Sequence, residues 1–276
     1  MNKKVVLITG ASSGIGLETA KMLASQGHKV YGTSRDIKRI EKLKEFGIIG
    51  LELDVSIDES CKNCIDKIIK DEGKIDVLIN NSGYGSYGPI ETVDLDEAKK
   101  QFEVNVYGLI RMSKLVIPYM RKQHSGRIIN ISSAGGRVTT FLGGWYHASK
   151  YAVEALSDSM RMELKQFGIK ISIIEPGGIK SNWGVLTANN LLEASKNTPY
   201  EDVSKRVANI YKELYGGKSK LLTKPGKVAK KISKAVNSKY PRTRYLFGFG
   251  ARPMIFAHWI LPNKVFDYIM KRMYEI

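Results

Sequence analysis

The chain has 276 residues, of which 43% are hydrophobic and 26% are charged, and its formal net charge is +17. This hydrophobic content excludes a disordered chain, and no apolar run reaches the length of about 18 residues that a transmembrane helix needs. Cys61 and Cys64 are the only cysteines, so no disulfide framework is predicted and we expect a reducing, cytoplasmic location.

Apolar segments typical of strands alternate with helical segments as far as residue 175. The predicted strands are 5–9, 29–33, 48–53, 77–80, 127–132 and 170–175, and the predicted helices are 15–26, 37–45, 59–70, 95–122 and 146–167. This alternation indicates parallel strands joined by right-handed helical crossovers. The strands are nearly continuous apolar runs, as in sheets covered by helices on both faces. We therefore predict an α/β fold with a doubly wound parallel sheet.

The pattern changes after the sixth predicted strand. Residues 182–200 are polar and predicted to be irregular, whereas 201–215 and 225–236 are predicted helices, the second entered through Pro225. We expect one domain over 1–276. Its parts would be a core (1–181), a lid over a bound small molecule (182–224) and a basic, partly apolar helical extension (225–276).

A glycine-rich segment joins the first strand to the first helix. Its glycines permit a tight turn and a close approach of a pyrophosphate to the backbone. The following helix start offers unpaired N–H groups and the positive end of the helix dipole. An ordinary strand-to-helix turn is the alternative. The residues expected to contact a dinucleotide here are Gly10, Ser12, Ser13, Gly14, Ile15 and Gly16.

Tyr146 and Lys150 form a YxxxK pair on a predicted helix. Positions i and i+4 share one helix face, so the phenol and the ammonium point the same way. A nearby positive charge lowers the pKa of a tyrosine, which would let Tyr146 exchange a proton with a carbonyl or alcohol oxygen. The pair is common by chance and carries weight only together with the glycine loop.

The spacing TGxxxGxG at residues 9–16, followed by YxxxK, resembles the short-form branch of the short-chain dehydrogenase/reductase family. The motifs occur in the family's order across residues 1–185. The resemblance implies a Rossmann-like sheet and an oxidoreductase that acts on CH–OH groups. It also implies a homodimer or homotetramer formed through the helices near 95–122 and 146–167.

The family's catalytic set matches four positions. Ser133 matches the catalytic serine, thirteen residues before Tyr146, with Ser132 as the competing choice. Its hydroxyl would bond the substrate oxygen as charge develops there. Asn105 matches the family's asparagine, which holds a water that relays protons to the lysine. Lys150 would also bond the nicotinamide ribose.

Further cofactor contacts follow from the same resemblance. The first group is Asp54 after the third strand, and Asn81 and Gly83 in an NNSG segment that resembles the family's NNAG motif. The second resembles the PGxxxT segment after the sixth strand and comprises Pro176, Gly177, Ile179 and Ser181. Ser181 keeps the hydroxyl of the family's threonine and would hold the carboxamide group of the nicotinamide.

The end of the second strand favours NADP(H) over NAD(H). NAD-preferring members carry an acidic residue where Ser34 stands, and Arg35 follows it. A guanidinium can bind a 2′-phosphate that a carboxylate would repel. The alternative is that Arg35 is a solvated loop charge and that Asp36 binds the ribose of NAD(H).

Aromatic residues follow the later strands and suggest an apolar substrate. Tyr84, Tyr87, Phe141, Trp145 and Trp183 fall where a substrate would lie beside the nicotinamide. A pocket lined by them suits a steroid-, retinoid- or lipid-like ketone, aldehyde or secondary alcohol. Ordinary loop packing is the alternative.

The C-terminal region is the most basic part of the chain. Residues 201–276 hold 17 Lys or Arg against 5 Asp or Glu, a net charge of +12. The segment Pro241–Tyr245, followed by Gly248 and Ala251, resembles the extended C-termini of steroid- and retinol-dehydrogenase-like members. Residues 247–276 interleave apolar and basic residues. They could lie on an anionic membrane, cap the pocket or form an interface.

Other functions are less well supported by the sequence. A 3-oxoacyl-carrier-protein reductase would use a basic surface, but the long extension argues against it. A catalytically silent NADP(H)-sensing protein would not need the four catalytic matches. No nucleic-acid motif accompanies the basicity, and the single CxxC at 61–64 lacks the further ligands of a metal site.

Overall fold

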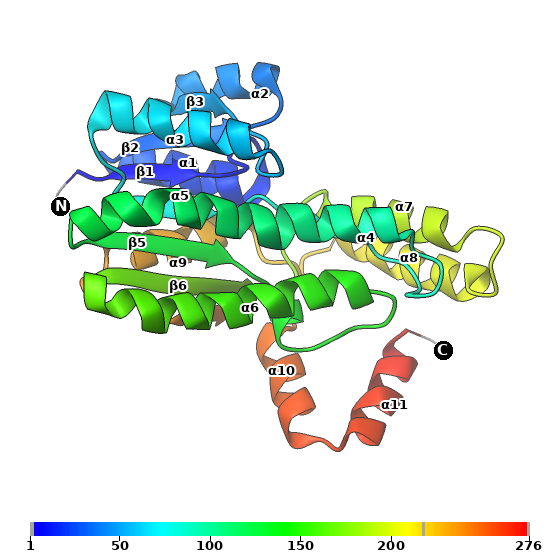
Figure 1. Ribbon diagram of the computed structural model, residues 1–276. Helices are drawn as coiled ribbons and strands as arrows, with labels where there is room; N and C mark the ends of the chain where they lie inside the picture. The colour runs from blue at the N-terminus through cyan, green and yellow to red at the C-terminus, as the bar shows by residue number, and fades with distance from the viewer. Residues whose placement is uncertain (1–2, 217–218, 275–276) are drawn as a thin grey trace.

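The computed structural model describes residues 3–216 and 219–274 of the chain. Within them, seven strands form one parallel sheet with the order β3-β2-β1-β4-β5-β6-β7 (Figure 1). The strands are β1 (Val5–Ile8), β2 (Lys29–Ser34), β3 (Ile49–Glu52), β4 (Val77–Asn80), β5 (Gly126–Ile131), β6 (Ile169–Pro176) and β7 (Arg244–Phe247). The predicted doubly wound parallel sheet is confirmed.

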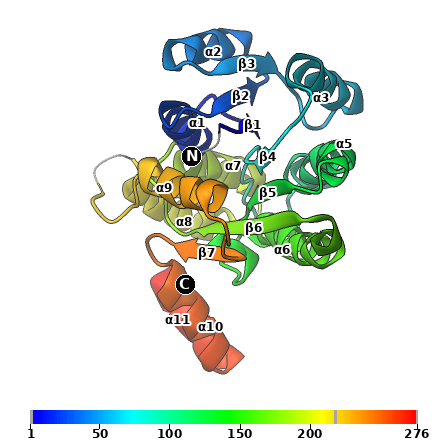
Figure 2. The ribbon, with the colours of Figure 1, turned by 90° about the vertical axis from the view of Figure 1, so that its left-hand side faces the viewer.

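Helices cover both faces of the sheet, as Figure 2 shows in end view. The first part of the chain forms α1 (Gly14–Ser25), α2 (Ile37–Glu41), α3 (Asp58–Glu72), α4 (Leu95–Phe102), α5 (Gly108–Lys122) and α6 (Gly144–Leu164). The second part forms α7 (Trp183–Ser195), α8 (Glu201–Tyr215), α9 (Pro225–Asn237), α10 (Ala251–Ile260) and α11 (Asn263–Met273). Short helical turns lie at η1 (Lys42–Phe46), η2 (Glu103–Tyr107), η3 (Ala134–Gly136) and η4 (Lys165–Phe167).

The strand β1 is apolar throughout because both of its faces are buried. In β1, Val6 and Ile8 pack with α1 and α9, whereas Val5 and Leu7 pack with α3 and α5 on the other face. Side chains of a strand alternate between the faces, so a strand buried on both sides needs apolar residues at every position.

The order of the strands determines where along the sheet edge a ligand can bind. Because β1 and β4 are neighbours and their crossovers run in opposite directions, the loops that follow these two strands diverge. Open α/β sheets bind ligands in the crevice at such a switch point, at the carboxyl ends of the strands. The glycine loop after β1 and the NNSG segment after β4 both lie at this edge.

Three elements differ from the sequence predictions. Residues 183–195 form the helix α7, although 182–200 was predicted to be irregular, because Thr187, Ala188 and Leu191 find a buried environment. The strand β7 was not predicted, and it pairs Tyr245 with Ile174 of β6. The predicted helix 95–122 is interrupted by a π-helical turn at η2.

No helix in the described part of the chain combines the length and the apolar character needed to cross a membrane.

Candidate active site

The glycine loop has the geometry of a phosphate cradle. Gly10 and Gly14 have positive φ angles of 65° and 54°, and a Cβ added to Gly16 would lie 2.3 Å from the Gly10 oxygen. A Cβ added to Gly14 would meet nothing within 4 Å, so the outer side of the turn is open. Ser13 makes no side-chain cap, and α1 has no acidic residue in its first turn. The N–H groups at the start of α1 are therefore suited to an anion.

Asn81 fixes the loop to the end of β4. Its Nδ2 donates to the main-chain oxygens of Thr9 at 3.0 Å and Gly10 at 2.9 Å. In return, the Thr9 hydroxyl accepts from the backbone N–H groups of Asn81 and Ser82, both at 2.9 Å. The side chain of Asn81, predicted to contact a cofactor, thus positions the turn that would hold it.

Arg35 lies exposed at the end of β2. Its Nη1 is 3.9 Å from Asp54 Oδ2, and 71% of its side chain is accessible. Asp36, the alternative residue for an NAD-type role, caps α2 through Arg39 N at 3.3 Å and pairs with Arg39 Nε at 3.1 Å. Burial opposes ionisation of Asp54, but hydrogen bonds from Ser56 and the charge of Arg35 outweigh it and lower its pKa.

A positively charged pocket of about 340 Å³ opens beside Ser12 of the loop. Its lining contains three cations, Lys21, Arg39 and Lys42, against one carboxylate, Glu45. Sequence reasoning missed these cations because they come from α1, α2 and η1, and only folding brings them to Ser12.

Tyr146 and Lys150 lie on the buried side of α6, and Ser133 lies at the end of β5. Lys150 Nζ is 5.9 Å from the centre of the Tyr146 ring and donates to Ile131 O at 3.0 Å. The Ser133 hydroxyl accepts from Gly135 N at 3.0 Å. Ser132 is turned the other way, toward Glu154, so Ser133 is the serine beside Tyr146.

Burial dominates the protonation of both groups. It raises the pKa of Tyr146 to about 12, although a hydrogen bond with Ser133 opposes the shift. It also lowers the pKa of Lys150 to about 8, although the Glu154 carboxylate opposes that shift. Desolvation is therefore the main influence on the pKa of Tyr146, and the Lys150 ammonium donates to Ile131 O.

Asn105 lies in the π-helical turn η2, and the bulge aims its amide at the site. Its Oδ1 accepts from Tyr84 N at 3.0 Å, and its Nδ2 donates to Tyr84 O at 2.9 Å and to Ser149 Oγ at 3.1 Å. A Cβ on Gly83 would lie 3.0 Å from Asn105 Oδ1 and 3.6 Å from Lys150 Nζ. These contacts bring Gly83, Asn105 and Lys150 together. Single-turn π-bulges are frequent at functional sites.

The segment after β6 is held by β7. Gly177 N donates to Phe247 O at 2.9 Å, and a Cβ on Gly177 would lie 2.3 Å from Phe249 O. The Ile179 side chain is buried in the core with α1 and α9, so only its main chain is available to a ligand. Ser181 Oγ is 3.4 Å from Ile179 O.

Aromatic rings surround the hydroxyl-bearing end of Tyr146. The ring centres of Tyr87 and Trp183 lie 5.7 and 5.4 Å from that of Tyr146, and Tyr211 lies 5.7 Å from Tyr87. Of the other predicted aromatics, Phe141 packs on Tyr274 and Trp145 packs on Phe102. Tyr211 and Tyr274 were missed because α8 and α11 join the site only through tertiary packing.

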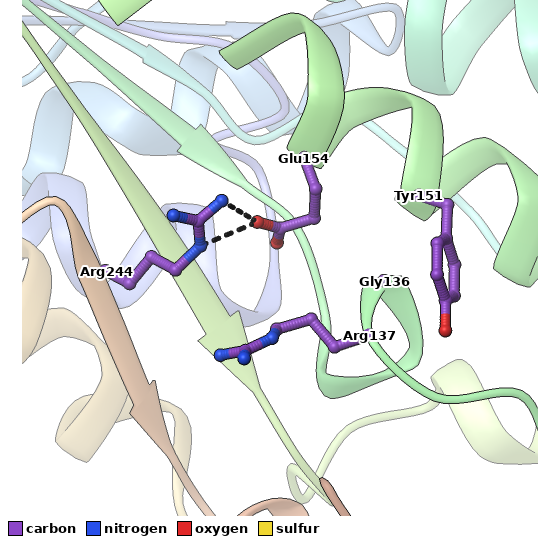
Figure 3. Close-up of a pocket in the computed structure, with 5 residues that line it drawn as sticks. All are labelled: Gly136, Arg137, Tyr151, Glu154 and Arg244. Carbon is purple, nitrogen blue, oxygen red and sulfur yellow. Dashed lines mark hydrogen bonds and ion pairs between the residues drawn. The ribbon is translucent and has the colours of Figure 1, made fainter. Parts of the chain in front are cut away.

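A second charged cluster lies behind Lys150, one helical turn along α6. Figure 3 shows Arg244 of β7 pointing toward Glu154 in a pocket of about 350 Å³. Arg244 bonds Glu154 Oε2 at 3.1 Å and Asp158 Oδ2 at 2.6 Å, and it lies 3.2 Å from the fully buried Glu175. Burial and the charge of Glu154 raise the pKa of Glu175 to about 7.

Comparison with known proteins places this site in a family. A model of the short chain dehydrogenases matches residues 4–190. A probable short-chain type dehydrogenase/reductase of Helicobacter pylori, VdlC, is 36% identical over 267 residues, which cover 97% of this chain and 96% of VdlC. A 3-ketodihydrosphingosine reductase of Bacteroides thetaiotaomicron is 38% identical over 281 residues, which cover 100% of both chains.

A solved structure shares the whole fold. The crystal structure of a short-chain dehydrogenase from Streptomyces avermitilis superposes with a TM-score of 0.80 at 28% identity, covering 99% of this chain and 96% of the other. The parallel sheet with helices on both faces agrees with this match. This chain belongs to the short-chain dehydrogenase/reductase family of oxidoreductases.

Proposed function

We propose that this enzyme is an NADP(H)-dependent oxidoreductase that interconverts a hydrophobic, lipid-like ketone or aldehyde and the corresponding alcohol. The observation that carries the proposal is the position of Tyr146. Its ring lies 5.4 Å from the ring of Trp183 in an aromatic cluster, while Ser133 and Lys150 flank it on the polar side.

The catalytic roles follow from this arrangement. The nicotinamide would supply or accept the hydride at the carbonyl carbon. Tyr146 donates the proton to the carbonyl oxygen in reduction and takes it back in oxidation. Ser133 hydrogen-bonds that oxygen, Lys150 holds positive charge near the phenol, and Asn105 orders the backbone beside Lys150.

The residues at the carboxyl ends of the strands fit a dinucleotide. The open turn at Gly14 and the uncapped start of α1 suit the pyrophosphate. The adenosine end would meet Asp54 and Arg35, and Asn81 and Gly83 would line the crevice. Pro176, Gly177, the main chain of Ile179 and the hydroxyl of Ser181 would face the nicotinamide. Gly10, Ser12, Ser13, Ile15 and Gly16 complete the phosphate loop.

NADP(H) is the preferred cofactor in this proposal. The exposed guanidinium of Arg35 and the cationic pocket beside Ser12 favour a 2′-phosphate. Asp36 is engaged with Arg39 as the cap of α2, which argues against its use on the ribose of NAD(H).

The substrate class follows from the aromatic cluster and from one relative. Tyr87, Trp183 and Tyr211 offer an apolar environment next to Tyr146. The relative of 38% identity is named for a ketone reductase of a long-chain lipid base. We therefore favour long-chain lipid ketones over steroids or retinoids.

We further propose a homodimer or homotetramer formed through α5 and α6. Exposed apolar residues on or next to these helices, Tyr107, Leu156 and Met162, support an interface there. We place the enzyme in a reducing, cytoplasmic compartment because Cys61 and Cys64 are both free and buried.

The experiment is an assay of NADPH oxidation with long-chain ketones, in the wild type and in Tyr146→Phe. We expect Tyr146→Phe to lower kcat by about 10²-fold or more, because the proton donor is lost. Ser133→Ala should lose activity and Ser132→Ala should keep it, which makes the two serines a matched pair. Equal rates in the wild type and Tyr146→Phe would reject the proposal.

A further inference from the structure

The helices α10 and α11 form a hairpin that projects from the β7 edge of the molecule (Figures 1 and 2). Its outer surface is apolar although it faces solvent. Trp259 is 80% exposed, and its apolar neighbours on the two helices are exposed as well: Phe256, Ile260, Val265, Tyr268 and Ile269. Several large exposed apolar side chains on one short hairpin indicate an interaction site.

The inner side of the same hairpin packs on the active site. Phe266, Met270 and Tyr274 follow each other at intervals of four residues, and all three are buried in the cluster that contains Tyr87 and Tyr146. Tyr274 hydrogen-bonds with Tyr211 and lies 6.2 Å from Phe141, measured between ring centres. The hairpin therefore separates the catalytic aromatic cluster from the exterior.

Basic residues border the outer apolar surface. Residues 251–273 carry Arg252, Lys264, Lys271 and Arg272 against Asp267, four basic residues and one acidic residue for a net charge of +3. Arg272 Nε donates to the Tyr268 hydroxyl at 3.3 Å, which places a cation beside an exposed ring. Exposed Trp and Tyr together with Lys and Arg characterise surfaces that lie in the headgroup region of a bilayer.

The hairpin differs from the other basic helix of the C-terminal region. The helix α9 also carries exposed lysines, among them Lys230, Lys231 and Lys234, but its apolar side is buried against α1 and the sheet. Basic charge without exposed apolar surface suits solvent. The combination of both is found on the hairpin, and two copies of it would bring like charges together.

We propose that the outer surface of the α10–α11 hairpin docks on an anionic lipid bilayer. The docking rests on exposure and charge alone. The docking would serve to deliver a lipid substrate to Tyr146 beneath the hairpin, and this part of the inference rests on the proposed function. The inner side of the hairpin packs, through Tyr274, in the same cluster as Tyr87 and Tyr211. Docking would therefore place the hairpin between the bilayer and the catalytic cluster.

Co-sedimentation of the full chain with vesicles tests the docking without reference to catalysis. The vesicles contain phosphatidylcholine alone or phosphatidylcholine mixed with phosphatidylglycerol. We expect binding to the mixed vesicles that weakens as salt is raised. Each basic residue near an anionic surface strengthens binding by roughly fivefold, so the double variant Lys271→Gln/Arg272→Gln should bind about 25-fold more weakly.

Two further variants separate the surface from the overall charge. Phe256→Ser/Trp259→Ser should weaken binding on the order of tenfold or more, because it removes the apolar part. Lys230→Gln/Lys231→Gln on α9 makes the same charge change as the first variant and should bind like the wild type. Thermal unfolding and NADPH oxidation with a short, water-soluble ketone confirm that each variant is folded.

Several results would overturn the proposal. They are absence of wild-type binding, equal binding to both kinds of vesicle, and equal losses in the hairpin and α9 variants. A wild type that binds no vesicles but dissociates into smaller species when Trp259 is changed would assign the surface to a second copy instead. Loss of lipid reduction with docking intact would count against the proposed function alone.

Discussion

The ammonium of Lys150 donates a hydrogen bond to the main-chain oxygen of Ile131, with 3.0 Å between Nζ and O. Ile131 is the last residue of β5, two positions before Ser133. The bond therefore connects the helix that carries Tyr146 to the strand that carries Ser133. It couples the two sides of the site through one buried side chain.

Replacing Lys150 tests whether its charge is needed for catalysis without being needed for folding. Lys150→Met keeps the length of the side chain and removes a desolvated ammonium, so we expect the melting temperature at neutral pH to be no lower than that of the wild type. We expect kcat to fall by about 10²-fold or more, because the phenol loses its cation. NADPH oxidation and thermal unfolding measure the two effects. An active Lys150→Met enzyme would contradict the role assigned to Lys150.

The same residue predicts how stability depends on pH. Burial lowers the pKa of Lys150 to about 8, below its ordinary value of 10.5. Between these values the unfolded chain binds more protons than the folded one, so the contribution of Lys150 to stability rises with pH. The slope is at most about 1.4 kcal/mol per pH unit.

Urea unfolding between pH 8 and about pH 9.5 tests this slope. Unfolded tyrosines ionise near pH 10 in both proteins, so their contribution cancels in the difference between the variant and the wild type. The difference in unfolding free energy between Lys150→Met and the wild type should shrink as pH rises. A difference that stays constant over this range would show that Lys150 is charged in the folded protein throughout.

The buried cluster behind the site depends on Arg244. Arg244→Met would leave Glu154 and the fully buried Glu175 with only the more distant Arg137, 3.8 Å from Glu175, and we expect a loss of about 3 kcal/mol at neutral pH. The loss should shrink as pH falls below the Glu175 pKa of about 7, since protonation removes the unpaired charge.

Arg161→Met is the matched control for this change. Arg161 pairs with Asp158 at 3.3 Å on the surface of α6, and its removal should cost less than about 1 kcal/mol. Urea unfolding at pH 5 and pH 8 compares the two variants. Equal losses in both, or a larger Arg244→Met loss at pH 5, would contradict the prediction.

Arg35 is the residue that we propose to favour NADPH over NADH. Arg35→Ala should weaken NADPH binding by about 10- to 100-fold, the range of a lost charge-assisted hydrogen bond, and leave NADH binding unchanged. Dissociation constants from cofactor fluorescence measure both. Lys67→Ala is the control, because it removes a surface cation of α3 that is paired with Asp71 and lies outside the lining of that pocket. Tighter binding of NADH than of NADPH by the wild type would reverse the cofactor assignment.

The local elements of this site were readable from the sequence. The glycine loop needs residues that tolerate positive φ, and Gly10 and Gly14 supply them. The i, i+4 spacing places Tyr146 and Lys150 on one face of any helix they form. Six of the seven strands were predicted, and in the central strands β1 and β4 burial on both faces leaves a nearly unbroken apolar run.

Tertiary structure alone decided the surroundings of these motifs. The strand β7 is a four-residue segment whose pairing with β6 joins positions about 70 apart, and the helix α7 is stabilised by burial that its sequence pattern does not reveal. The same packing encloses Tyr146 and raises its pKa instead of lowering it. Spacing along a helix is a local property, so it can be predicted directly from the sequence. Desolvation depends on which distant residues, here Trp183, Tyr211 and Tyr274, the folded chain brings against a side chain.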